Sequence, residues 1–278
     1  MKTVIGFKNS LEELLSGRGL GLDTTPEWVS RSAEAVFGER MDIVPYVQRI
    51  IDGVKSEGDN FLRSVTHQIE DIPLQQIEVD KESLGNAYER IHKDLRLSLE
   101  VSASRVKEFQ EKCLPQNWED RDSGYAVNFV PVESAAAYVP GGTARYPSTV
   151  LMTAVPAKVA GVGRFSIACP GSREDGLPPD SVLAAAYIAK VDKVYSLGGA
   201  QAIAALAYGT ESVVKSDVIC GPGNIFVTVA KKLVYGDVGI DGLYGPTETV
   251  ILADETANPT LCAADLLAQA HTDPLANP

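Results

Sequence analysis

Four glycine-rich turns carry the residues of this chain that are best suited to bind a ligand. They read Tyr138-Val-Pro-Gly-Gly142, Leu197-Gly-Gly-Ala-Gln201, Gly221-Pro-Gly-Asn224 and Gly245-Pro-Thr-Glu248. Most of them join a predicted strand to a predicted helix, so their N–H groups lie at a helix N-terminus, where anionic or polar ligand groups are favoured. Turns of this kind meet at the carboxyl edge of an α/β sheet, and they therefore predict one ligand crevice.

Three side chains in these turns have both a binding and a structural interpretation. Tyr138 ends a predicted strand, where its ring could stack on an adenine or nicotinamide ring or cap the core. Gln201 lies in the first turn of an apolar helix and, if buried, needs a polar partner, either a ligand or a neighbouring backbone group. Asn224 begins another apolar helix, which its side chain could cap, or it could face a cofactor. The residues alone do not decide between the binding and the structural interpretation for any of the three side chains.

The fourth turn and the last predicted helix offer further polar side chains. Thr247 and Glu248 are compatible with a plain turn. The helix carries Gln269, His271 and Thr272 near its end. Residues three apart share a helix face, so Gln269 and Thr272 point together and His271 points away. A lone histidine at a helix end is more often a cap or surface residue than a metal ligand.

Residues 1–120 are predicted to form a helical N-terminal region. The spacing of apolar residues predicts helices at 9–15, 42–65 and 82–113. We expect Gly53 and Gly58 to interrupt the second helix, and a turn at about 93–95 to divide the third.

Strands and helices alternate in the second region, residues 121–278. Residues 126–132 read as a hairpin or edge strand. The predicted strands are 135–139, 164–169, 191–197, 214–220 and 249–253, and the predicted helices are 147–160, 179–189, 200–208, 224–235 and 259–270. This alternation predicts an α/β fold with a Rossmann-like, mostly parallel sheet and helices on both faces.

The overall composition argues against nucleic-acid and membrane partners. The chain has 278 residues, of which 45% are hydrophobic and 22% charged, and its net charge is −12. An excess of acidic residues disfavours binding to the phosphates of nucleic acids and anionic membranes. No stretch approaches the ~18 uncharged apolar residues that a membrane helix needs. The four cysteines have no CxxC spacing, so we expect reduced thiols and a cytoplasmic protein.

Taken together, the motifs resemble the histidinol dehydrogenase family. The resemblance runs from about residue 30 to the end and is strongest over 135–270. It rests on seven segments in order, namely 138–142, 146–161, 198–209, 221–227, 238–241, 245–248 and 263–269.

The resemblance implies an enzyme that oxidises L-histidinol to L-histidine through an aldehyde. The family uses two NAD molecules and a bound zinc ion, usually in a homodimer. By position, the resemblance implies that Tyr138, Gln201 and Asn224 contact NAD. It implies that Thr247 lies near the substrate and that Gln269 binds both substrate and zinc.

The chain departs from the family pattern at the metal site. The family's second zinc ligand on the last helix is a histidine, whereas this chain has Thr272 there, a poor neutral zinc donor. His271 could substitute only if the helix unwinds. The family's catalytic Glu-His pair and remaining zinc ligands lie in a C-terminal part that this chain lacks, and His67 and His92 do not replace them. We therefore expect a catalytically incomplete N-terminal portion, and we assign no catalytic residue.

Two other functions remain open from the sequence. The altered pocket at Gln269 and Thr272 is compatible with a related dehydrogenase that oxidises another small alcohol. A degenerate, non-catalytic module that binds NAD or a partner chain is compatible with intact cofactor turns beside an incomplete metal site.

Overall fold

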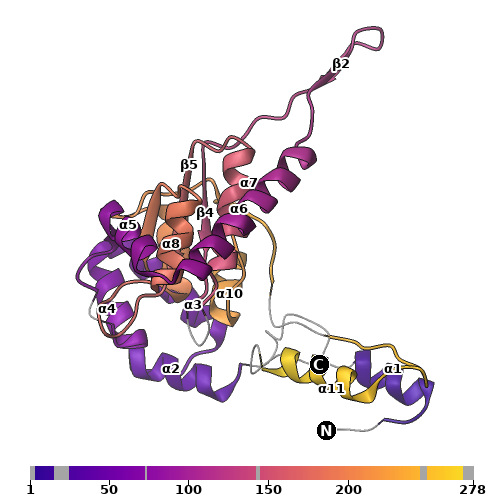
Figure 1. Cartoon of the computed structure of the whole chain (residues 1–278). Helices are drawn as coiled ribbons and strands as arrows, with labels where there is room; N and C mark the ends of the chain where they lie inside the picture. Colours follow the sequence, from indigo (N-terminus) through magenta and orange to yellow (C-terminus); the bar gives the residue numbers. More distant parts are fainter. Residues whose placement is uncertain (1–3, 16–24, 73, 142–144, 245–248, 272–278) are drawn as a thin grey trace.

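A six-stranded sheet lies at the centre of the fold (Figure 1). The computed structural model describes residues 4–15, 25–72, 74–141, 145–244 and 249–271. The strand order is β1-β6-β5-β4-β7-β8; the five strands from β4 to β8 run parallel, and β1 pairs antiparallel with β6. The strands are β1 (Glu78–Val79), β4 (Ser134–Tyr138), β5 (Arg164–Cys169), β6 (Lys193–Ser196), β7 (Val218–Cys220) and β8 (Gly239–Ile240). The predicted α/β fold is confirmed.

Helices cover both faces of this sheet. Alternate residues of a strand point to opposite faces, and in β4 Ala136 and Tyr138 join one apolar core while Ala135 and Ala137 join the other. The first core also takes in α2 (Glu27–Phe37), α3 (Ile43–Glu57), α4 (Asp59–Glu70), α9 (Gly199–Tyr208) and α10 (Ile225–Val234). The second takes in α5 (Lys81–Arg90), α6 (Lys93–Cys113), α7 (Pro147–Val159) and α8 (Asp180–Ile188).

The strand order reverses between β4 and β7. From β4 the chain builds outward through β5 to β6, and it then returns to place β7 on the other side of β4. Ala136 at the centre of β4 lies opposite Ser166 of β5 and Ile219 of β7. In open α/β sheets a crevice forms outside the carboxyl ends of the strands at such a reversal. The fold therefore sets the ligand site between the loops that follow β4 and β7.

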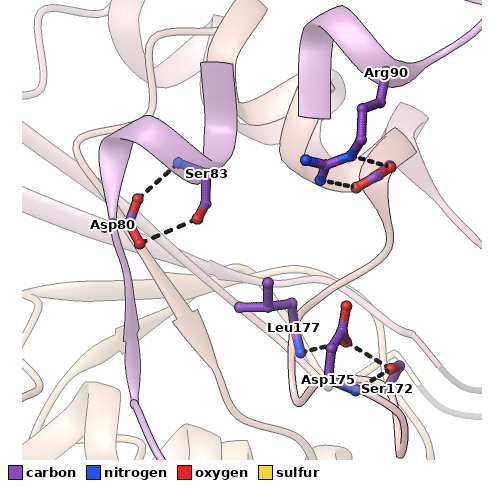
Figure 2. Close-up of polar contacts among 7 residues, drawn as sticks. Asp80, Ser83, Arg90, Ser172, Asp175 and Leu177 are labelled. Atoms are coloured by element: carbon purple, nitrogen blue, oxygen red, sulfur yellow. Dashed lines mark hydrogen bonds and ion pairs between the residues drawn. The ribbon is translucent and has the colours of Figure 1, made fainter. Parts of the chain in front are cut away.

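Helix α5 has polar contacts at both of its ends, and the one at its C-terminal end joins it to α8 (Figure 2). Asp80 caps α5, because its carboxylate accepts hydrogen bonds from Ser83 N at 2.7 Å and Ser83 Oγ at 3.1 Å. At the other end, the guanidinium of Arg90 forms a two-pronged pair with Asp180, with N···O distances of 2.9 and 2.6 Å. Both side chains are exposed, so this pair sets orientation more than stability.

Several details differ from the sequence prediction. Gly53 does not interrupt α3, which continues to Glu57, whereas the break at Gly58 is confirmed. Residues 249–253 form no strand, and the two-residue strands β1 and β8 were not predicted. The turn expected at 93–95 lies two residues earlier, and a hairpin of β2 (Trp118–Asp120) and β3 (Tyr125–Val127) begins before residue 126.

Helices α2 to α6 and β1 share the sheet's two cores with the later elements. The division of the chain at residue 120 stays a prediction. Helices α1 (Phe7–Leu15) and α11 (Pro259–Ala270) lie apart from the sheet in Figure 1, and α11 buries none of its residues. The predicted bounds of α11 are confirmed, including Pro259 in its first turn.

Candidate functional site

A cleft of about 780 Å³ lies at the reversal between β4 and β7. Its volume is within the range of pockets for small molecules and cofactors. The walls come from the segments 69–72, 138–141, 170–173, 199–201 and 222–226, together with side chains of α2, α3 and α7. Three of the four glycine-rich turns thus meet at one cavity, as the sequence predicts; the fourth, 245–248, lies outside the described residues.

Tyr138 lies at the end of β4, with its ring in the core and its hydroxyl at the start of α9. The side chain is 4% exposed, and its oxygen accepts a hydrogen bond from Gly199 N at 3.2 Å. Burial raises the pKa of this phenol, so it is neutral near pH 7. The core-capping interpretation is therefore confirmed, while the contact with NAD stays a prediction.

Gln201 is 1% exposed in the first turn of α9, and its partner comes from a distant helix. Its Nε2 donates to Oε1 of Glu70, the last residue of α4, at 3.0 Å. Neither partner considered from the sequence, a ligand or a backbone group, accounts for this contact. Sequence reasoning missed Glu70, because a carboxylate at the end of an amphipathic helix carries no local signal of burial.

Asn224 caps α10. Its Oδ1 accepts hydrogen bonds from Phe226 N at 3.1 Å and Val227 N at 3.2 Å, while the residue itself is exposed at the cleft. Since these N–H groups would otherwise have no partner within the helix, the cap stabilises the start of α10. The capping interpretation is confirmed, and the role toward a cofactor stays a prediction.

The turn before Asn224 is fixed by an ion pair between Lys231 and Asp241, both of which bond to the backbone of Gly221. Lys231, 2% exposed on α10, donates to the carbonyl of Gly221 at 3.0 Å and pairs with Asp241. Asp241 in turn accepts from Gly221 N at 2.8 Å. Gly221 has a φ of +100°, and a Cβ there would lie 2.3 Å from the carbonyl oxygen of Tyr138, so glycine is required on both counts.

The 170–178 segment forms the wall next to β5. Ser172 Oγ donates to Asp175 at 2.7 Å, and the same carboxylate accepts from Leu177 N at 3.0 Å, which closes a tight loop (Figure 2). Arg173 ties this loop to α4, because its Nε donates to the main-chain carbonyl of Glu70 at 3.2 Å.

Among the predicted substrate and metal residues, the one that the structure describes, Gln269, does not line this cleft. Gln269 lies on α11, which Figure 1 draws apart from the sheet, and it is not among the residues that line the cavity. His271 follows α11 and is exposed, while Thr247 and Thr272 lie outside the described residues. Within the described part of the chain, no group of three His, Cys, Asp or Glu side chains could hold a metal ion.

Comparison with known proteins identifies the family. The family model described as histidinol dehydrogenase matches residues 37–278. The chain belongs to the histidinol dehydrogenase family. A relative from Prochlorococcus marinus subsp. pastoris, named histidinol dehydrogenase, is 47% identical over 249 residues, which cover 88% of this chain and 58% of the relative. One of the same name from a Synechococcus strain is 48% identical over 235 residues, or 83% and 54% of the two chains.

A solved structure agrees with this family. The crystal structure of histidinol dehydrogenase from Elizabethkingia anophelis matches with a TM-score of 0.76 at 30% identity, covering 89% of this chain and 58% of that one. The chain thus spans little more than half the length of these family members. No helix within the described residues is long and apolar enough to cross a membrane.

Proposed function

We propose that this chain forms the NAD-binding part of a protein that oxidises L-histidinol to L-histidine. Membership of the histidinol dehydrogenase family supports the reaction. The observation that carries the NAD assignment is the convergence of Tyr138, Gln201 and Asn224 on one cleft at the strand reversal. NAD would accept the hydride there, and the residues of this chain would bind and orient it.

Two helix N-termini at the cleft, together with its volume of about 780 Å³, support a dinucleotide as the ligand. The N-termini of α9 and α10 both border the cleft, and helix N-termini favour phosphate groups. Asn224 already occupies two N–H groups of α10, whereas the N-cap residue of α9 is Gly198, which has no side chain, and one N–H there, that of Gly199, donates to the Tyr138 hydroxyl. We therefore assign the diphosphate to the start of α9, with Asn224 and Tyr138 bordering the rest of the ligand.

The described residues do not fit zinc in the same way. Gln269, the ligand that the family resemblance implies, supplies one neutral oxygen on α11. Zinc stays a proposal for the whole protein, and we derive no catalytic step through it. We also propose a homodimer in the cytoplasm, on the strength of the family resemblance alone.

Calorimetric titration with NAD tests the binding site, with Asn224→Asp as the variant. Aspartate caps a helix as well as asparagine does, so α10 stays intact while a carboxylate enters the cleft. Repulsion of the NAD phosphates should weaken the affinity by about tenfold or more. Asn258→Asp is the matched control, because Asn258 caps α11 through the same kind of bonds away from the cleft.

The outcomes separate the possible functions. Saturable NAD binding that Asn224→Asp weakens and Asn258→Asp leaves unchanged supports the proposed site. A wild-type chain that binds no NAD contradicts it. On the whole protein, NADH formation from L-histidinol supports the dehydrogenase. NADH formation with another alcohol alone, or NAD binding without turnover, would favour a related dehydrogenase or a binding module.

A further inference from the structure

Glu70 reaches the NAD-facing side of the cleft from outside the glycine-rich turns. It ends α4, which packs against α9, and it is one of the residues that line the cavity. Its carboxyl lies directly against the turn before α9, because a Cβ built on Gly198 would be 2.3 Å from Glu70 Oε1. Glycine at position 198 thus admits the carboxyl to the N-terminus of α9.

The same carboxyl fixes the orientation of the Gln201 amide. Gln201 Nε2 donates to Glu70 Oε1 at 3.0 Å, and the amide oxygen turns toward Gly199, where a built Cβ would lie 2.7 Å from it. Since Gln201 is 1% exposed, water does not compete for these positions. Glu70 therefore sets the orientation of the Gln201 amide, with Nε2 toward Glu70 and the oxygen toward Gly199.

The surroundings of Glu70 make its charge sensitive to small changes in pH near neutrality. Burial raises its pKa to about 7, and the hydrogen bond from Gln201 opposes this rise. The titratable and charged groups near it are Tyr138 of β4, Cys169 of β5, Arg173 of the 170–178 segment, and His67 and Asp71 close by in sequence. The charge of Glu70 adds to burial in raising the pKa values of Tyr138 and Cys169.

We propose that Glu70 is a positioning residue of the NAD site, which orients the Gln201 amide and sets the charge that the dinucleotide meets at the start of α9. This inference rests on the proposed NAD binding. A diphosphate near α9 repels an ionised Glu70 and not a protonated one. Binding therefore favours the protonated carboxyl, takes up protons near pH 7, and weakens as the pH rises through that range.

Calorimetry of NAD binding at about pH 6 and about pH 8 tests the charge. We expect about fivefold weaker affinity at the higher pH, the ratio that follows if bound NAD favours the protonated carboxyl by about tenfold. Glu70→Gln keeps an oxygen that can accept from Gln201 but removes the charge, so its affinity should be nearly independent of pH. Asp71→Asn is the matched control, since it removes the neighbouring exposed charge and should keep the wild-type dependence.

A ligand-free measurement tests the contact with Gln201 independently. The side-chain amide signals of ¹⁵N-labelled glutamine should include one that titrates near pH 7, disappears in Gln201→Leu and does not titrate in Glu70→Gln. If the chain binds no NAD, the proposed function fails, and this amide titration alone decides the inference. If NAD binds with the same pH dependence in wild type and Glu70→Gln, or if the Gln201 amide does not titrate, the inference is overturned.

Discussion

Replacing the buried Lys231 tests how the turn before Asn224 is held. In Lys231→Met the side chain keeps its apolar stem but loses the ammonium that bonds to the carbonyl of Gly221 and to Asp241. Each charge-assisted hydrogen bond is worth about 1.5–3 kcal/mol. Asp241 is 27% exposed and keeps the N–H donors of Gly221 and Gly242, which offsets part of the loss. We therefore expect about 3 kcal/mol of destabilisation, at the lower end for a broken buried pair.

Thermal unfolding followed by circular dichroism measures this loss. A change of about 3 kcal/mol corresponds to a drop in Tm of about 5 °C for a chain of this size. Lys232→Met is the matched control, because Lys232 is the next residue on α10 and its side chain is exposed. This substitution should shift Tm by less than about 2 °C. If Lys231→Met melts within about 2 °C of that control, the ion pair does not hold the turn as described.

Three further predictions concern buried groups around the cleft. Gly221→Ala should lower Tm more than Gly236→Ala, because both have positive φ but only the first places a Cβ against backbone. Burial raises the pKa of the Cys169 thiol to about 12, so a thiol reagent should label exposed Cys113 first and Cys169 only on unfolding, with mass spectrometry as the readout; equal rates would contradict this. Glu70 is a half-buried carboxyl whose pKa is raised to about 7 from 4.5, so its contribution to folding stability is lost as pH rises between those values. The Tm advantage of Glu70→Gln over wild type should therefore grow from about pH 5 to about pH 8, and a constant difference would contradict it.

The sheet was predictable because its signals are local. The core strands and the helices between residues 134 and 234 are apolar segments separated by glycine turns, and the observed bounds agree within a few residues except at β7. Gly53 misled the prediction because its role is tertiary. A Cβ there would lie 2.3 Å from the ring of Phe61, so the glycine allows α3 and α4 to approach closely without ending the helix. Residues 249–253 have a strand-like composition but gain no partner strand.

The candidate site was predictable only in part, for the same reason. Tyr138, Gln201 and Asn224 stand beside glycine turns, and the strand reversal brings those turns together. Glu70 and Lys231 act through contacts with residues 131 and 10 positions away in the chain. Glu70 stands at the end of an amphipathic helix, and Lys231 stands within an apolar one. Charged residues at such positions are usually on the surface, so the sequence did not distinguish these two.

The two short outer strands affect how this protein behaves at high concentration. The outer side of β6 would otherwise present unpaired backbone groups to neighbouring molecules, but Glu78 and Val79 of β1 pair there with Tyr195 and Val194. At the opposite border, β8 is also only two residues long. A two-residue strand offers too few groups for a second molecule to add a strand of its own. Through β1, the N-terminal region thus supplies a block against intermolecular β-pairing at the edge of β6.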